Sequence, residues 1–447
     1  MQKNILNYLK IKDIKMTEKL KKENVMEIIC TLYLVIFCIL KICALIKYID
    51  AIPINTIMFV LGWIVLILIF INKRGALNYN SLLNIFGIVI IINAVTYRDI
   101  ETIKTDLFEI FYIFVIYNIA AQYFKKDNYI RLIKIILLIT FAMITIFFIN
   151  YIVVFIRDGV LTKSEIMHMF FSNINAGAML ALINIIMVIY LYKIKKINIG
   201  ITIFICIYYI IFIFLSYART TVLTLIILGF YLIYQKYFKG HNNFILIKKI
   251  FKGLCVICLC IILFLGSILI LKRNYDYTNE LDKKIYNVEK KLANITTLRY
   301  WLWKYSIQEL IEVNPVIGLK DNFGQDSFEN MLKNEEINKL SMAQKEVLTR
   351  NNVHDGYIQI LVKNGFVGFA IIMLFFTKNI FNIFKLDYNE VYYQYIKYIY
   401  LFYIFINIFE NHIILSNSFF VLFLWIHFGR DSVLIKDINK EQLNKKE

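Results

Sequence analysis

The stretch "NNVHDGYIQILVKNGFVGF", residues 351–369, begins with polar residues and then becomes an apolar run that would enter a membrane. The run still carries Gln359, Lys363 and Asn364, and it holds two glycines at G-x-x-G spacing. Isolated polar groups are costly in hydrocarbon, so such side chains tend to face protein or a wet cavity. Ionisable residues at such places are candidates for function, and the role of His354 therefore depends on the side of the membrane on which it lies.

The composition of the whole chain indicates a membrane protein. Hydrophobic residues make up 60% of the sequence, there are only 2 prolines in 447 residues, and the mean hydropathy is +0.63. These values leave too few polar residues to cover a soluble globule of this size. We therefore expect lipid to surround most of the chain.

Apolar stretches of about 17 to 25 residues, long enough to cross ~30 Å of hydrocarbon as a helix, recur along the chain. They predict an all-α polytopic membrane protein with about twelve transmembrane helices, or eleven if two of the stretches do not both span. The predicted spans are 25–46, 54–71, 82–96, 106–123, 130–156, 172–192, 198–216, 219–236, 249–271, 357–377, 393–409 and 412–428.

The distribution of Lys and Arg predicts the orientation, because short cytoplasmic loops are rich in basic residues. With the N-terminus inside, most basic residues of the tails and short loops fall on the cytoplasmic side. The short outer segments then carry only Lys47, Arg98, Lys104, Arg157, Lys163 and Arg219. The net charge of +18 therefore reflects topology and contact with anionic lipid, and no nucleic-acid partner is expected.

This topology divides the chain into five parts. We read the long outer segment, whose charged helix-forming stretches flank an aromatic centre, as a helical cap on the membrane bundle. The predicted parts are a cytoplasmic basic tail (1–24), nine transmembrane helices (25–271), an extracytoplasmic loop (272–356), three transmembrane helices (357–428) and a cytoplasmic tail (429–447).

Three polar residues on the outer side form a candidate site. Arg219 stands in "LSYARTT" between two spans, Arg299 opens the aromatic centre "LRYWLW" of the long loop, and His354 precedes a span. Arginine binds phosphate with two parallel hydrogen bonds, and histidine accepts a proton near neutral pH. Each residue also has a structural alternative: a membrane-surface anchor for Arg219, a cation–π or ion-pair role for Arg299, and an ordinary capping histidine for His354.

The motifs around these residues resemble the O-antigen ligase and polymerase superfamily, whose members are integral-membrane glycosyltransferases acting on polyprenyl-diphosphate-linked sugars. "VHDGYIQILVKNGFVGF" resembles the family's His-Asn-x-Tyr/Phe-Leu/Ile-Gln... Gly-x-x-Gly signature, and "LSYARTT" resembles its Ser-x-Ser-Arg. "LRYWLW" followed by "NPVIGLKDNF" resembles Arg-x-x-x-Trp... Asn-Pro-x-x-Gly-x-Gly, and "FFSNINAGAML" resembles an Asn-x-Asn segment. The order of the motifs and the late external loop agree as well, and the fold is expected to be similar to that of GT-C-type membrane glycosyltransferases.

Three positions depart from the family pattern. Ala218 replaces the second serine of the Arg219 motif, Lys320 stands at the second glycine of Gly-x-Gly, and Asp355 replaces asparagine after His354. None of these changes removes a charged residue of the candidate site.

The resemblance implies metal-independent glycosyl transfer without a cofactor, in which a lipid-linked oligosaccharide donor reacts with a hydroxyl of a glycan acceptor. His354 would be the general base, and Arg219 and Arg299 would neutralise the departing diphosphate. The implied substrate-binding residues are Asn175, Lys320, Tyr357 and Gln359. No metal site is expected, and Gly365 and Gly368 are read as a close helix-packing site.

Two activities within the family remain open, and a third lies outside it. A polymerase joins lipid-linked repeat units into a capsule or O-antigen, whereas a ligase transfers the finished glycan to a separate acceptor. We favour the polymerase because no acceptor-binding domain is recognisable beyond the cap. A lipid-linked oligosaccharide transporter would be expected to show repeat symmetry between its halves, which the sequence lacks. The predicted location is the bacterial plasma membrane, with the active site facing outward.

Overall fold

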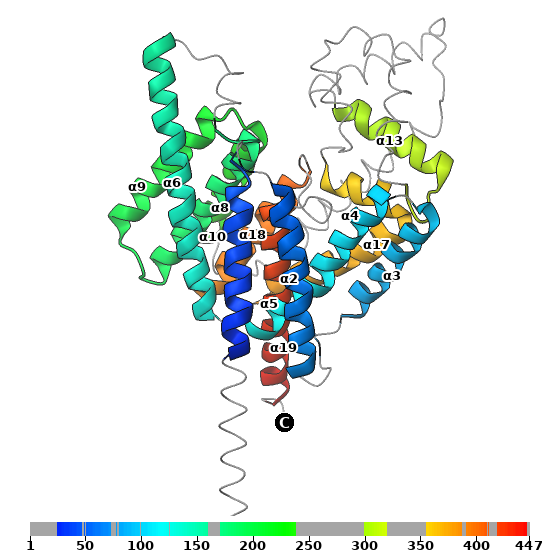
Figure 1. The fold of residues 1–447 in the computed structure, drawn as a ribbon. Coiled ribbons are helices and arrows are strands. Elements are labelled where there is room, and N and C mark those ends of the chain that lie inside the picture. The colour runs from blue at the N-terminus through cyan, green and yellow to red at the C-terminus, as the bar shows by residue number, and fades with distance from the viewer. Residues whose placement is uncertain are drawn as a thin grey trace, which may run out of the picture.

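A computed structural model of the chain contains helices and no strand among the residues that it describes, which confirms the all-α prediction for them (Figure 1). One isolated β-bridge joins Ile46 and Phe171. The described residues are 25–46, 49, 51–72, 77, 80–98, 100–124, 126–159, 170–237, 299–319, 355–386, 390–408, 410 and 418–444. The predicted span 249–271 lies outside them.

The helices follow the predicted apolar stretches closely in most of the chain. The first described helix covers Val25–Cys43. The others are α2 (Ala51–Asn72), α3 (Ser81–Tyr97), α4 (Ile100–Ile110), the π-helix η1 (Phe111–Ile116), α5 (Tyr117–Tyr123), α6 (Lys126–Asp158), α8 (Ile174–Lys193), α9 (Ile199–Leu215), α10 (Arg219–Tyr237), α13 (Arg299–Val313), α17 (Gly356–Lys385), α18 (Val391–Ile406) and α19 (Phe419–Asn444).

Two elements near the C-terminus differ from the prediction. α17 continues to Lys385 instead of ending at 377, and its backbone is broken at Gly365. α19 begins at Phe419 and continues to Asn444, whereas the sequence predicts a span over 412–428 followed by a tail. Asp431 and Ser432 follow residue 428 and are buried in the described part of the chain. Hydropathy predicts that a span ends at such polar residues. The helix continues nevertheless, because these residues find partners in the interior of the protein.

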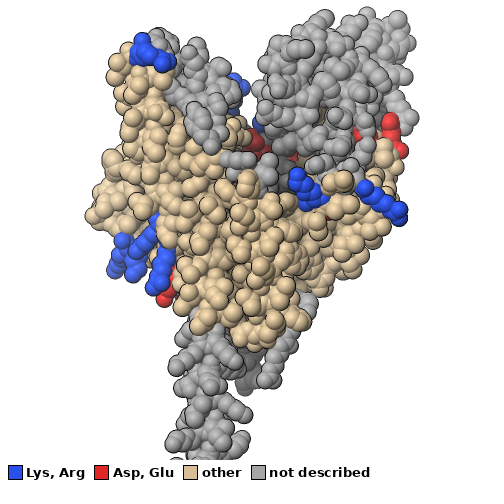
Figure 2. Space-filling model, in the orientation of Figure 1, with Lys and Arg blue, Asp and Glu red and all other residues tan. Residues whose placement is uncertain are grey.

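Five described helices are long and apolar enough to cross a membrane, and α3, α9 and the first part of α10 are shorter apolar helices. Large hydrophobic side chains are exposed along them, for example Leu138 at 70%, Ile71 at 68% and Phe204 at 60%. Figure 2 shows Lys and Arg at the margins of the described surface, with a wide uncharged area between them. An apolar belt of this extent fits a multi-pass membrane protein and not a soluble one.

The core lies around α8, α18 and α19, near the middle of the bundle in Figure 1. Nearly every residue of α8 is buried, and α5 packs closely on α19, where a Cβ at Gly429 would lie 2.3 Å from the Tyr117 carbonyl oxygen. α13 lies at the upper end of the bundle in Figure 1, and the C-terminus lies at the lower end.

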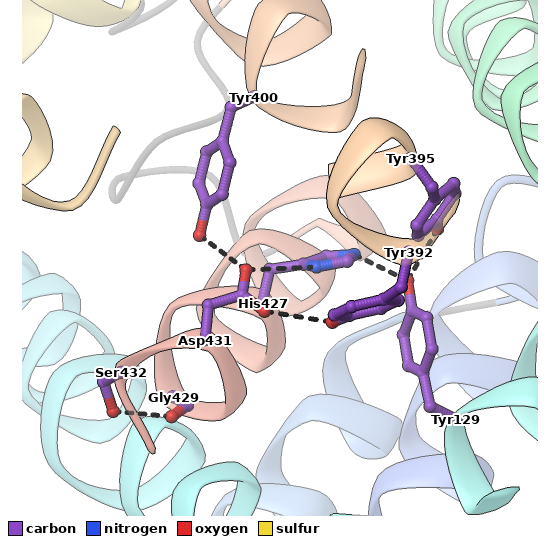
Figure 3. A network of polar contacts seen from close by, with 8 residues as sticks. All are labelled: Tyr129, Tyr392, Tyr395, Tyr400, His427, Gly429, Asp431 and Ser432. Carbon is purple, nitrogen blue, oxygen red and sulfur yellow. Dashed lines mark hydrogen bonds and ion pairs between the residues drawn. The ribbon is translucent and has the colours of Figure 1, made fainter. Parts of the chain in front are cut away.

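A buried polar network holds α6, α18 and α19 together (Figure 3). The Tyr129 hydroxyl lies 2.8 Å from His427 Nε2 and 2.6 Å from the Tyr395 hydroxyl. Tyr392 and Tyr400 each donate a hydrogen bond of 3.0 Å to the carboxylate of Asp431 on α19. Polar side chains from three helices therefore bond to one another inside an apolar core, as buried polar groups generally do.

Candidate functional site

The candidate site is built around the first turn of α17. Asp355 is the N-cap residue of this helix, and its carboxylate accepts hydrogen bonds from the backbone N–H groups of Tyr357 (2.9 Å) and Ile358 (2.8 Å). Aspartate is one of the best N-cap residues, because its oxygens satisfy amides that no helical carbonyl can reach. The Gly356 N–H donates to the Asn407 carbonyl oxygen at 2.8 Å. The start of α17 is therefore attached to the end of α18.

Glu410 brings a second carboxylate to the same region. Its Oε1 accepts a hydrogen bond from Arg299 Nη2 at 3.4 Å, and the two side chains are 9% and 20% exposed. Arg299 is the first residue of α13, and Glu410 follows α18. The guanidinium of Arg299 also acts electrostatically on Asp355. One arginine and two carboxylates from three separate segments thus meet at the start of α17.

Burial changes the protonation of both carboxyl groups. Asp355 is 6% exposed, and burial raises its pKa to about 7, against the opposing effects of its two backbone hydrogen bonds and of Arg299. Burial likewise raises the pKa of Glu410, while the charge and hydrogen bond of Arg299 act in the lowering direction. Desolvation therefore outweighs the arginine at each carboxyl.

The structure describes five of the seven residues predicted for the site. His354 and Lys320 lie outside the described residues, although Asp355 follows His354 directly in the chain. Arg219 is exposed at the start of α10, and its side chain has no hydrogen bond or ion pair among the described residues. Of the two predicted arginines, Arg299 lies in the cluster around Asp355 and Arg219 does not.

The remaining predicted residues are placed as follows. Asn175 is half-buried in the first turn of α8, and its backbone N–H donates to the side chain of the N-cap residue Asn173 at 2.9 Å. The Asn-x-Asn segment thus starts a helix. The Tyr357 hydroxyl donates to the Ile404 carbonyl oxygen at 3.0 Å, so it already has a protein partner on α18. Gln359 is buried in the first turn of α17.

The two glycine-containing motifs of the sequence meet each other at the break in α17. Gly365 has φ +63°, and a Cβ there would lie 2.3 Å from the Val316 carbonyl oxygen. Gly318 has φ +96°, and a Cβ there would lie 2.0 Å from the Lys363 carbonyl oxygen. Both positions therefore require glycine, for conformation and for space. Gly368 has a different role, since it packs closely against Val89 of α3 as the sequence predicts for a helix-packing glycine.

The segment after α13 satisfies the backbone groups that the break leaves without helical partners. Phe366 N–H donates to the Pro315 carbonyl oxygen (2.9 Å), and Val367 N–H donates to that of Val316 (3.3 Å). In the other direction, Leu319 N–H donates to the Val362 carbonyl oxygen at 2.9 Å. We call residues 315–319 and 362–367 together the interlock.

Lys363, inside the interlock, forms a buried ion-pair cluster with α4. Its Nζ lies 2.8 Å from Glu109 Oε1 and 3.1 Å from Asp106 Oδ1, and all three side chains are at most 2% exposed. A buried lysine is tolerated only with such partners, and removing one of them would leave an uncompensated charge. Lys41, which also lies within a predicted span, is likewise buried and donates to Asn55 Oδ1 at 2.5 Å.

Sequence reasoning missed four residues of this region. Glu410, Asp106 and Glu109 are acidic residues close to the ends of apolar stretches, where a carboxylate usually marks the membrane surface. Asn93 lies within a span, and its Nδ2 donates to the carbonyl oxygens of Lys363 (2.8 Å) and Ile317 (3.0 Å). A signal existed for Asn93, since a polar residue in an apolar run needs a partner. No local pattern identifies that partner.

These features define a multi-pass helical membrane protein with an arginine–carboxylate cluster where α13, α17 and the end of α18 meet. Residues 204–373 match the family model described as O-antigen ligase. This match confirms the resemblance to the O-antigen ligase and polymerase superfamily, and it supports a ligase- or polymerase-type role in surface polysaccharide assembly. It includes every predicted site residue except Asn175. No curated protein matches the chain.

Proposed function

We propose that this protein polymerises polyprenyl-diphosphate-linked oligosaccharide repeat units into a surface polysaccharide, a capsule or an O-antigen, on the outer face of the bacterial plasma membrane. The observation that carries this proposal is the family match over residues 204–373, which contains Arg219, Arg299 and His354 in their expected order. The cluster of Arg299 with Glu410 and Asp355 supports it, because that cluster holds an arginine beside the helix that follows His354.

The proposed reaction is a direct displacement at the anomeric carbon of the donor sugar. A hydroxyl of the acceptor glycan attacks this carbon, the new glycosidic bond forms, and the bond to the lipid diphosphate breaks with its electron pair leaving on the diphosphate. His354 accepts the hydroxyl proton, and Arg219 and Arg299 stabilise the negative charge of the leaving group. A single displacement inverts the configuration, and no metal ion is required for these steps.

Asn175, Lys320, Tyr357 and Gln359 complete the proposal as residues of the substrate-binding region. Lys320 would add a phosphate contact. Tyr357 and Gln359 belong to the first turn of α17, beside Asp355, and would form the wall of the site. This accounts for the polar start of the stretch 351–369, since the beginning of the span faces substrate and not lipid.

A polymerase and a ligase are distinguished by the products that they make from lipid-linked repeat units. We expect purified enzyme given only polyprenyl-diphosphate repeat units to produce a ladder of lengthening chains, also in the presence of a chelator. A ligase would extend nothing until a separate acceptor is added, and a transporter would leave the glycan unchanged. If the protein binds the donor but yields only unextended repeats, the proposal that it is a polymerase is rejected.

The roles of the three residues are tested with single variants in the same assay. A lone general base contributes typically ~10²- to 10⁴-fold, so His354→Ala should lose the ladder at normal protein level. Arg219→Lys and Arg299→Lys should also be slow, because a point charge does not reproduce the bidentate contact with phosphate. Near-normal turnover in His354→Ala would remove the histidine from the reaction, and normal turnover in both lysine variants would argue against phosphate recognition.

A further inference from the structure

Asn93 connects three segments that lie far apart in the sequence. It is a fully buried residue of α3, and its single carboxamide nitrogen donates both to Ile317, in the segment after α13, and to Lys363, at the break in α17. The hydroxyl of Tyr97, one turn further along α3, donates to the Gly318 carbonyl oxygen. α3 therefore holds both halves of the interlock through side chains and not only through packing.

The interlock is the point from which two helical arms lead to the candidate site. α13 has 15 residues, with Arg299 at its N-terminal end and the interlock just after its C-terminal end. The first part of α17 runs from Asp355 to Gly365, and α13 packs against α17. The far ends of both arms meet in the cluster of Arg299, Asp355 and Glu410.

The length of these arms makes the site sensitive to small movements of the interlock. At 1.5 Å per residue, α13 is about 22 Å long, so a rotation of about 5° at its C-terminal end would displace Arg299 by roughly 2 Å. A misplacement of about 1 Å in an enzyme site costs on the order of 10²-fold in rate. The catalytic arginine therefore depends on how firmly the interlock is held.

We propose that Asn93 is a positioning residue for glycosyl transfer, which holds the interlock so that Arg299 keeps its place relative to Asp355 at the start of α17. This inference rests on the proposed function. Asn93 touches no substrate in this account, since it acts through Arg299. The buried cluster of Lys363 with Asp106 and Glu109 also fixes the same break against α4.

A double-variant cycle between Asn93 and Arg299 tests the proposal. The rate of repeat addition is measured per enzyme molecule that binds lipid-linked donor, so that unfolded protein does not count. Asn93→Ala should lower this rate about 10- to 100-fold in the wild-type background. In the Arg299→Lys background the same change should cost less than about threefold, because two residues that act through one group are not additive.

Asn184→Ala is the matched control. Asn184 is also a fully buried asparagine in an apolar helix, but its Nδ2 donates only to the Leu180 carbonyl oxygen of its own helix α8, at 2.9 Å. We expect this variant to stay within about threefold of its parent in both backgrounds, as is usual for residues without shared partners.

Each outcome decides between the alternatives. Equal losses from Asn93→Ala in both backgrounds, or a normal rate in the single variant, would overturn the positioning role. If Asn93→Ala does not accumulate, Tyr97→Phe replaces it in the test, since it removes only the hydroxyl that donates to Gly318. A rate that falls in the wild-type background but not in the Arg299→Lys background supports the proposal. An unchanged rate in the wild-type background overturns it. Unchanged protein that binds the donor but adds no repeats would instead contradict the proposed function itself.

Discussion

At the scale of single residues, Asp355 combines two demands that normally conflict. Its carboxylate caps α17 by accepting two backbone hydrogen bonds, which favours the charged form, yet its burial favours the neutral form. Burial dominates, and the pKa rises to about 7. Asparagine, the residue that the family motif carries here, would cap the helix equally well without a titrating group.

Asp355→Asn should therefore weaken the pH dependence of stability. In the unfolded chain the carboxyl ionises at its ordinary pKa of 3.8, whereas the folded protein holds the proton up to about 7. The unfolded state binds fewer protons over this interval, so the wild-type free energy of unfolding falls as pH rises from 4 to 7, by at most about 4 kcal/mol, and then levels off. Thermal unfolding midpoints in detergent at pH 5 and pH 7.5 measure this, and an unchanged difference in Asp355→Asn would contradict the assignment.

Glu410 should compete with the donor for Arg299. Its carboxylate forms an ion pair with the Arg299 guanidinium. A diphosphate that binds Arg299 would have to displace this carboxylate. We expect Glu410→Gln to lower the KM for lipid-linked donor by about two- to tenfold, since a hydrogen bond to a neutral partner is roughly half as strong. Glu312→Gln, at an exposed acid on the opposite end of α13, is the control. A KM that rises, or one that falls equally in the control, would show that Glu410 does not compete.

At the scale of elements, the break in α17 is stable because another segment supplies its missing hydrogen bonds. Helix interruptions at membrane depth are tolerated where protein, and not lipid, surrounds the freed backbone groups. The "NPVIG" segment after α13 and the glycines of "VKNGFVG" are the two halves of one contact. The motifs are therefore linked by backbone geometry, independently of any contact with substrate.

Replacement of Gly365 should be far more damaging than replacement of a glycine on a lipid-facing helix. Gly365→Ala adds a Cβ 2.3 Å from a backbone oxygen at a positive φ, and strained substitutions of this kind cost of order 1–3 kcal/mol before any clash is counted. Gly229→Ala is the control, because in the described part of the chain no atom outside its own helical turn lies within 4 Å of the new Cβ, and it should be neutral or stabilising by about 0.5–1 kcal/mol. Equal unfolding midpoints for the two variants would mean that the interlock does not hold the break.

At the scale of the whole molecule, exposed aliphatic side chains surround a core that holds its polar groups in pairs and networks. α13 and the C-terminal end of α19 lie at opposite ends of the bundle (Figure 1). Because basic residues of the short loops gather on the side of the termini, we predict that α13 faces outward and the termini face the cytoplasm.

Labelling of single cysteines tests this orientation in intact cells. A membrane-impermeant thiol reagent should modify Val313→Cys, at a 61% exposed position of α13, before lysis. Lys196→Cys, in the exposed turn after α8, should react only after lysis. The unchanged chain measures the background from its seven native cysteines. Reaction of Val313→Cys only in lysed cells would reverse the topology and place the candidate site on the wrong side for the proposed reaction.

The fold class and the approximate position of most helices could be predicted from local sequence, because the cost of placing a residue in lipid adds up along a local stretch of chain. The sequence also predicted the family resemblance that the match over residues 204–373 confirms. The partners of buried polar groups were decided only by the tertiary structure. Glu410, Asn93 and the acids of α4 acquire their roles from helices that are distant in sequence, and a pattern read along one segment carries no information about which other segment will pack against it.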